Sequence, residues 1–255
     1  MNPDLIRINK YIAHQGICSR RQADELIRTG RVKINGDFVR DMGTKIDPTQ
    51  DEVQVDGEVI QTIDQLIYIA LNKPVDYLST VADEQGRRTV IHLLHQHKHP
   101  HDRKWPKVWP VGRLDRDSHG LILLSNDGDL THKLTHPKYH IPKTYQVTVS
   151  GHLDNWKIHK LKFGVQFKDG LTKPADVAII KTNKTAKRHT LQITLYEGKH
   201  RQIRRMCSAI KLEVVDLLRT AIGPIELGDL EPKDIRMLTE KEITMLYNQR
   251  GLTSK

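Results

Sequence analysis

The sequence predicts an α+β fold in two parts: a small module of short helices and hairpins, then a larger domain built on a mixed, mainly antiparallel sheet. The chain has 255 residues, enough for two domains that each have a core. Helical and hairpin patterns fill about the first 60 residues. Beyond them, strand patterns outnumber helical ones without regular alternation of strand and helix. We expect the boundary at Gln61 to Gln65, between residues 1–62 and residues 63–250.

Two helices and two hairpins are predicted in the first module. Ile8, Tyr11 and Ile12 recur at helical spacing. Ser19 and Gln22 have the spacing of a capping box that begins a second helix. Gly30 is expected to end this helix. Asn35-Gly36 and Asp56-Gly57 are expected to form the turns of the two hairpins.

Strand patterns dominate the larger domain. Five strands are predicted, at residues 66–71, 120–125, 144–149, 176–180 and 191–196. Two helices are predicted, at residues 129–134 and 201–210, and the second has apolar residues at helical spacing. Residues 93–107, rich in histidine, proline and lysine, are expected to form a long surface loop.

The chain is basic. It has 41 Lys and Arg against 31 Asp and Glu, and its densest positive stretch, residues 181–219, holds ten Lys or Arg against three acids. Such a surface favours a polyanionic partner, although a solvated basic face gives the same pattern. Aromatic residues make up 5% of the chain, which is few for a broad base-stacking platform.

Cysteine usage and hydropathy indicate the compartment. Cys18 and Cys207 lie far apart without metal-ligand spacing, so neither a disulfide framework nor a structural zinc site is expected. No apolar run approaches the roughly 20 residues that cross a bilayer. The first residues are charged where a signal peptide needs an apolar stretch. We therefore expect a cytoplasmic protein with no membrane partner.

An aspartate between two arginines is the first candidate for chemistry. Asp115 lies between Arg113 and Arg116, shortly before Gly120 and an apolar strand. A carboxylate held beside arginine stays ionised and can act as a nucleophile or a base. The alternative is a loop acid in an ordinary ion pair.

The second candidate is a helix with three arginines. Arg201 and Arg205 are four residues apart and share a face, so we expect Arg201 to be an outward cation. Arg204 adjoins the buried side of Ile203 and is expected to point inward. An inward arginine can fix a carboxylate or a phosphate through two hydrogen bonds. A solvated basic helix is the alternative.

Motifs along most of the chain follow the order of one known family. They are Arg7 to Ile12, Gly16 to Asp24, Ala70 to Pro74, Gly112 to Asp115 with Ser118, Gly120-Leu121, Lys143 to Tyr145, Arg201 to Cys207 and Leu238-Thr239. The sequence resembles the RsuA/RluB/E/F family of ribosomal pseudouridine synthases, and within it the F type. The resemblance implies an S4-like RNA-binding domain at residues 1–62 and a pseudouridine synthase domain at residues 63–250. It also implies isomerisation of uridine to pseudouridine in large-subunit (23S) rRNA.

The resemblance further implies roles for single residues. Asp115 is expected to be the catalytic aspartate, with Tyr145 packed against the target base and Arg204 paired with Asp115. Arg113 matches an arginine that helps to displace the target base in related synthases. The cations expected to bind RNA are Arg113, Lys10, Arg20, Arg21, Arg31, Lys33, Lys143, Arg201 and Arg205.

The implied reaction needs neither a redox partner nor an energy donor, so no cofactor is expected. It breaks the N1 to C1′ bond, turns the uracil and rejoins it through C5. Either attack of Asp115 on C1′ or removal of a C2′ proton fits the sequence. No metal site is expected, because histidines at alternate positions of a proline-containing loop ordinarily face water. The four that are able in principle to bind a metal are His95, His97, His99 and His101.

Three alternative functions stay open at this point. They are a synthase for small-subunit rRNA, a synthase with tRNA as a further substrate, and a non-catalytic rRNA-binding protein. The joint presence of Asp115, Tyr145 and Arg204 argues against the last, because binding phosphates requires cations and no carboxylate. We expect a monomer.

Overall fold

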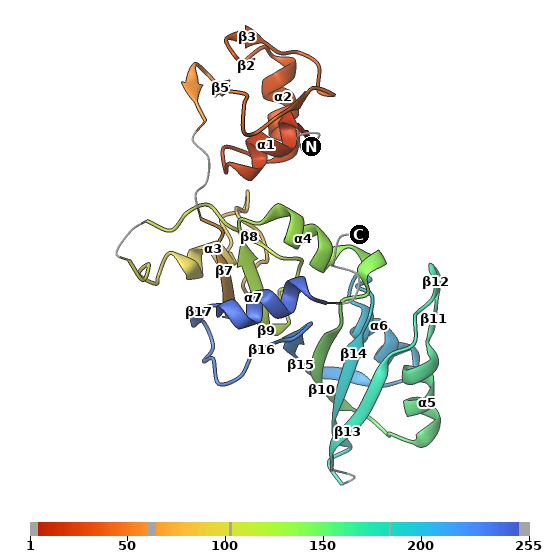
Figure 1. Ribbon diagram of the computed structural model, residues 1–255. Coiled ribbons are helices and arrows are strands. Elements are labelled where there is room, and N and C mark those ends of the chain that lie inside the picture. Colours follow the sequence, from red (N-terminus) through yellow and green to blue (C-terminus); the bar gives the residue numbers. More distant parts are fainter. Residues whose placement is uncertain (1–4, 61–64, 102–103, 184, 250–255) are drawn as a thin grey trace. The chain divides into compact units, whose positions relative to one another are not determined.

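The computed structural model describes residues 5–60, 65–101, 104–183 and 185–249 (Figure 1). The chain divides into two compact units. The first consists of Met1–Ile67 with two short pieces, Pro106–Val108 and Asn126–Gly128, and the second holds the other residues. The boundary expected between residues 62 and 63 falls within 61–64, outside the described residues, and stays a prediction.

Short helices and hairpins form the first unit, as the local signals predict. Its elements are β1 (Ile6–Arg7), α1 (Ile8–His14), α2 (Arg20–Arg28), β2 (Val32–Ile34), β3 (Asp37–Phe38), β4 (Lys45–Ile46), β5 (Val53–Val55) and β6 (Glu58–Val59). Ser19 and Gln22 form the predicted capping box at the start of α2. Asn35-Gly36 and Asp56-Gly57 take positive φ between paired strands, so both predicted hairpins are confirmed.

A nine-stranded sheet is the frame of the second unit. Its strands are β7 (Tyr68–Lys73), β8 (Trp109–Pro110), β9 (His119–Ser125), β10 (Lys143–Ser150), β13 (Asp176–Asn183), β14 (Arg188–Leu195), β15 (Glu213–Ile222), β16 (Ile225–Glu226) and β17 (Ile235–Met237). The order is β13-β14-β10-β15-β9-β7-β17, with β8 against β9 and β16 against β15. Among the described strand pairs of this sheet, β15 and β9 alone are parallel, so the predicted mixed, mainly antiparallel sheet is confirmed.

Helices of the second unit complete two hydrophobic cores, one with α5 and α6 and the other with α4 and α7. They are α3 (Val90–Leu94), α4 (Gly128–Thr135), η1 (Pro137–Tyr139), α5 (Asn155–Phe163), α6 (Gln202–Ala209) and α7 (Glu240–Tyr247), and a small hairpin consists of β11 (Gln166–Phe167) and β12 (Gly170–Leu171). α5 packs against β13 and α6 against β15, over a core that includes Val147 and Leu191 (Figure 1). The second core takes Leu130 from α4, Leu246 from α7 and Leu121 from β9.

Among the elements of eight or more residues, the sequence patterns miss α5, β15 and α7, and they also miss the short α3 and the two- or three-residue strands of the second unit. In β15, Asp216 and Arg219 interrupt the apolar residues, so the strand lacks a clean alternation even though it pairs with both β10 and β9. In α5 only Leu161 is buried, and lysines occupy much of the remaining surface. A short apolar stripe gives a weak helical signal.

The expected surface loop after Leu93 begins inside α3, where Leu93 and Leu94 are buried, so that part of the prediction is wrong. Trp105 anchors the loop by donating from Nε1 to the His97 carbonyl oxygen at 2.7 Å, and its ring packs edge-on against His99. The described residues contain no cluster of three or more side chains able to hold a metal. No described helix is long and apolar enough to cross a bilayer.

Candidate active site

The turn between β8 and β9 holds Asp115. Ser118 is buried and donates its backbone N–H to the Asp115 carbonyl oxygen at 3.1 Å. Ser79 Oγ donates to the Leu114 carbonyl oxygen at 2.8 Å and accepts from the Leu114 N–H at 3.1 Å. Because these contacts hold the backbone on both sides, they orient the half-buried Asp115 side chain.

A cavity of about 400 Å³ lies beside this turn, within the second unit. The predicted site residues in its wall are Arg113, Asp115, Lys143, Tyr145 and Arg201. The volume falls in the range of small-molecule sites, roughly 300–1,000 Å³. Arg204 and Arg205 are absent from the wall as far as the described residues define it. The fold therefore brings the predicted aspartate and tyrosine to one cavity, with three of the predicted cations.

Arg204 points inward from α6, as the sequence predicts, but its partner is not Asp115. The side chain is 17% exposed. Nη2 donates to the Asp117 carbonyl oxygen at 2.7 Å, and Nε lies 3.3 Å from Asp117 Oδ2. The predicted pair is therefore corrected to Arg204 with Asp117, because α6 brings this arginine against the second carboxylate of the turn.

Arg201 belongs to the same site, which corrects its placement as an outward cation. The predicted helix begins at Gln202, and Arg201 lies at its N-cap with a φ of 50°. The Arg201 guanidinium donates two hydrogen bonds to the Asp117 carboxylate, at 3.0 and 2.7 Å. These bonds, together with the nearby Arg204, hold the pKa of Asp117 below its ordinary value. Asp117 thus joins the turn to the start of α6 through two arginines.

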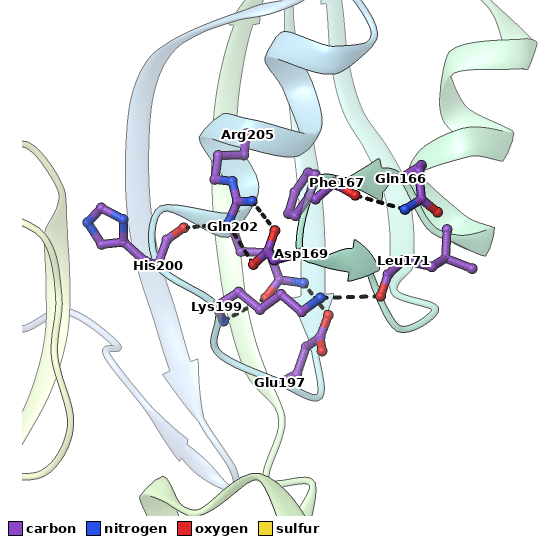
Figure 2. A network of polar contacts seen from close by, with 9 residues as sticks. All are labelled: Gln166, Phe167, Asp169, Leu171, Glu197, Lys199, His200, Gln202 and Arg205. Carbon is purple, nitrogen blue, oxygen red and sulfur yellow. Dashed lines mark hydrogen bonds and ion pairs between the residues drawn. The ribbon is translucent and has the colours of Figure 1, made fainter.

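The segment that carries these arginines is fastened to the β11–β12 hairpin (Figure 2). Arg205 forms an ion pair with Asp169, and its guanidinium carbon lies 3.9 Å from the centroid of the Phe167 ring. Lys199 Nζ donates to the Leu171 carbonyl oxygen at 3.3 Å. Arg205 is thus engaged within the protein, and its contact with RNA stays a prediction.

Arg219 on β15 is a site residue that the sequence patterns miss. It is 4% exposed and lines the cavity. Nε donates to the Leu121 carbonyl oxygen at 2.7 Å and Nη1 to the Arg113 carbonyl oxygen at 3.2 Å. Nη2 is buried without a hydrogen-bond partner in the described chain. The register between β10 and β15 places Tyr145 opposite Arg219. The sequence signal that could have identified Arg219 is a single arginine within the otherwise uncharged residues 217–222.

Two lysines, the buried Lys73 and the half-buried Lys143, add positive charge near the cavity. Lys73 is fully buried, and its Nζ donates to two backbone carbonyl oxygens at 2.9 Å each. Burial, and then the charge of Arg219, lowers the pKa of Lys73 to about 8, while Asp115 acts in the opposite direction. The same two causes lower the pKa of Lys143 to about 8. Asp115 therefore lies within electrostatic reach of a buried cation.

The predicted RNA-binding cations of the first unit lie on its helices and on or beside its strand β2. They are Lys10 on α1, Arg20 and Arg21 on α2, Arg31 before β2, and Lys33 on β2. Arg20 and Arg21 are exposed. Arg31 forms an ion pair with Asp56 at 2.6 Å, and Lys33 Nζ lies 4.5 Å from the centroid of the Phe38 ring. Their contacts with RNA stay predictions.

The cavity combines a carboxylate, a phenol and several cations. No ion pair within the described chain engages the Asp115 carboxylate directly, although its charge contributes to raising the pKa of Arg201. A carboxylate in that situation can act as a nucleophile or as a base. The guanidinium groups beside it suit phosphate oxygens. The arrangement is therefore able to perform chemistry on a substrate that carries phosphates.

Sequence relatives cover both units. A family model described as RNA pseudouridylate synthase matches residues 67–209, and one described as S4 domain matches residues 6–53. Ribosomal large subunit pseudouridine synthase B of Bacillus subtilis is 37% identical, over 94% of this chain and 95% of its own. The dual-specificity RNA pseudouridine synthase RluF of Escherichia coli is also 37% identical, over 97% of this chain and 80% of its own. Identity thus does not separate the B type from the F type.

A solved structure extends the likeness to the fold. A crystal structure of a pseudouridylate synthase has a TM-score of 0.65 and 32% identity, over 94% of this chain and 99% of its own. An uncharacterized RNA pseudouridine synthase of Aquifex aeolicus is 38% identical over 97% of this chain and 96% of its own. Together with the domain matches, these likenesses confirm the predicted fold class.

Proposed function

The chain belongs to the RNA pseudouridylate synthase family, and on that premise we propose that it isomerises a uridine, or a closely spaced pair, of large-subunit ribosomal RNA, with Asp115 as the catalytic residue. Membership of this enzyme family sets aside the non-catalytic RNA-binding protein. The observation that supports the residue assignment is that Asp115 and Tyr145 both line one cavity.

The target base has to leave its stack before it reaches this cavity. Flipping costs a few kcal/mol, and least where the base is already mismatched or single-stranded. Arg113, which is exposed beside Asp115, is the residue we propose to displace the base from the helix. Tyr145 is half-buried and offers the flipped uracil an aromatic face and a hydroxyl group.

Asp115 acts on the sugar of the flipped nucleotide. Either its carboxylate attacks C1′, or it removes the C2′ proton, and in both cases the electrons of the N1 to C1′ bond leave with the uracil. The uracil turns within the cavity and bonds to C1′ through C5. On the first route the bond between the Asp115 carboxylate and C1′ breaks in this step, and on the second route Asp115 returns the proton to C2′. The C5 proton is then lost, and N1 ends the reaction protonated. Atoms and electrons balance within one nucleotide, so we propose no cofactor and no metal.

The arginines divide into two groups in this proposal. Arg201 and Arg204 hold Asp117 and thereby fix the turn that carries Asp115. Arg219 holds the carbonyl oxygen of Arg113, and its buried Nη2, which has no hydrogen-bond partner in the described chain, is the donor we propose for a substrate oxygen. A preorganised cation of this kind stabilises developing negative charge without reorganising during the reaction.

The name of one relative supports large-subunit rRNA as the substrate, since the B-type relative is named for the large subunit. The excess of 41 Lys and Arg over 31 Asp and Glu supports a polyanionic partner in general. The dual-specificity name of the E. coli relative favours a second RNA, for which tRNA is our candidate, as an additional substrate. We further propose a cytoplasmic monomer, in keeping with ribosomal RNA as the target.

Mapping pseudouridine in a strain that lacks the gene tests the substrate. Carbodiimide labelling followed by primer extension should lose one stop, or a tight pair, in large-subunit rRNA. Complementation with the wild type should restore the stop, and Asp115→Asn should not. If the stop is lost from small-subunit rRNA instead, the proposed substrate is wrong and small-subunit rRNA is the substrate. If a stop is lost from tRNA as well, tRNA is a second substrate.

A further inference from the structure

Helix α5 presents aromatic and basic side chains to solvent. Trp156 is 58% exposed and Phe163 is 62% exposed, although both are large aromatic residues. Lys160 Nζ lies 5.7 Å from the centroid of the Trp156 ring, and the His159 ring stacks on the Phe163 ring at 4.3 Å. These four residues, the α5 stripe, lie outside the cavity wall and outside the core.

Helical geometry places the α5 stripe on one face. Trp156, Lys160 and Phe163 lie within about 60° of one another around the helix axis. Ile158 and Leu161 lie on the opposite side, where Leu161 is fully buried and Ile158 packs on the core. α5 packs against β13, the edge strand of the sheet (Figure 1). Burial of one face therefore fixes the α5 stripe on the outside of the unit.

The charge of α5 favours an anionic partner. The helix contains Lys157, Lys160 and Lys162, and it contains no Asp or Glu. Asp154, just before the helix, accepts a hydrogen bond from the Lys157 N–H as the N-cap. A second copy of the chain would bring equal lysine sets together, and like charges repel. A polyanion meets no such repulsion.

The spacing and chemistry of the α5 stripe suit unpaired nucleotides. Trp156 and Phe163 are about 10 Å apart along the helix axis. That length corresponds to about three steps of a stacked strand at roughly 3.4 Å each. Bases stack on aromatic side chains regardless of sequence, and lysine ammonium groups bind phosphates. Trp156 offers an exposed ring, the stacked pair of His159 and Phe163 offers a second aromatic surface, and Lys160 offers an ammonium group. These are the elements of a single-strand binding surface.

We infer that the α5 stripe is a docking surface for unpaired nucleotides of the RNA substrate, separate from the cavity. The inference rests on an RNA substrate, as the proposed function does, but not on which uridine is modified. Unpaired nucleotides near a flippable base are expected, because flipping costs least where pairing is weak. The α5 stripe would hold such a strand while the cavity receives the target.

Binding of a single-stranded oligouridylate to the full chain tests the inference. Trp156→Ala should weaken binding about fivefold or more, which is the lower end of the effect of removing one base stack. Trp156→Phe keeps a ring and should retain most of the affinity. Lys160→Ala should flatten the salt dependence, with a change of about 0.7 in the slope of log affinity against log salt.

Two control variants match these changes. Ile180→Ala removes a large apolar side chain that is 54% exposed on β13. Lys162→Ala removes the same charge as Lys160→Ala from the same helix, about 100° or more around the axis from Trp156 and Lys160. Ile180→Ala should bind the oligouridylate like the wild type, and Lys162→Ala should lose less affinity than Lys160→Ala. Equal losses of affinity in the two lysine variants would mean that RNA responds to the total charge of the helix and not to the α5 stripe. That result would overturn the inference.

Photo-crosslinking gives the direct readout. An oligouridylate that contains 4-thiouridine should crosslink within the peptide of residues 155–163, and Trp156→Ala should remove that crosslink. Crosslinks confined to other peptides, with unchanged affinity of Trp156→Ala, would refute the inference. A change in oligomeric state in Trp156→Ala, with unchanged RNA affinity, would assign the face to a second copy instead. Activity of the wild type on a large-subunit rRNA transcript is a separate readout, so its absence would count against the proposed function alone.

Discussion

Replacing Gly120 with alanine should force apart the two strands that hold the site. Gly120 on β9 pairs in parallel with Arg219 on β15, and its φ is +104°. A Cβ at Gly120 would lie 2.3 Å from the Arg219 carbonyl oxygen and 2.8 Å from the Arg219 nitrogen. Both are backbone atoms, which cannot rotate away as a flexible side chain can. The strands must therefore separate before alanine fits.

Two contributions make up the expected cost in the free energy of unfolding. Holding a residue with a Cβ at this φ costs on the order of 1–3 kcal/mol. The overpacking between strands costs roughly 1–3 kcal/mol more. The sum, about 2–6 kcal/mol, is a large part of the ~5–15 kcal/mol that stabilises a typical domain. Displacement of Arg219 should also weaken its 3.2 Å bond to the Arg113 carbonyl oxygen, so the isomerisation rate should fall.

Gly170 offers a matched control. Its φ is +107°, and no described atom lies within 4 Å of the Cβ that alanine would add. Gly170→Ala therefore has the backbone strain without the collision. Urea unfolding followed by circular dichroism should find Gly120→Ala less stable than Gly170→Ala by about 1–3 kcal/mol. Equal stability of the two variants would refute the argument that β9 and β15 require glycine at this contact.

Three further predictions concern the buried cations and the first unit. The pKa of Lys73 is about 8 in the folded chain, against 10.5 for an unperturbed lysine. Between these pH values the unfolded chain binds more protons than the folded chain. The free energy of unfolding of the wild type, measured relative to Lys73→Met, should therefore rise from pH 8 to pH 10.5. A flat difference in urea unfolding would contradict the lowered pKa. Arg219→Met leaves the buried Leu121 carbonyl oxygen without a donor, at about 1–3 kcal/mol, and removes the bond to the part-buried Arg113 carbonyl oxygen. It should lower the single-turnover rate at least about tenfold, and a rate within twofold of the wild type would contradict its role. Deleting residues 1–62 should weaken RNA binding and flatten its salt dependence, since lost phosphate contacts release fewer counterions, and an unchanged slope would mean that these residues do not touch RNA.

Local sequence signals predicted those features that depend on near neighbours. The capping box of Ser19 and Gln22 spans four residues, and each hairpin turn depends on two. The inward direction of Arg204 followed from the buried Ile203 beside it. Each of these was predictable because helical and hairpin geometry acts over a few positions.

Tertiary contacts determined what the sequence could not predict. Arg204 meets Asp117 because of the path of the turn after Asp115, which no helical pattern contains. Arg219 is buried because the carbonyl oxygens of Arg113 and Leu121, far away in the sequence, accept its hydrogen bonds. A charged residue in a strand weakens the apolar alternation that predicts the strand. Arg219 therefore contributes to the site and is also one reason why the sequence pattern does not predict β15.

Comparing Asp115→Asn with Asp117→Asn tests the central claim most directly. The two carboxylates are two residues apart, but only Asp115 lines the cavity, whereas Asp117 is held by Arg201 and Arg204. Release of tritium from RNA labelled at C5 of uridine follows the loss of the C5 proton in single turnover. Asp115→Asn should release none above background while still binding RNA, and Asp117→Asn should be slower than the wild type but measurable. An active Asp115→Asn, within tenfold of the wild type, beside an inactive Asp117→Asn would contradict the account.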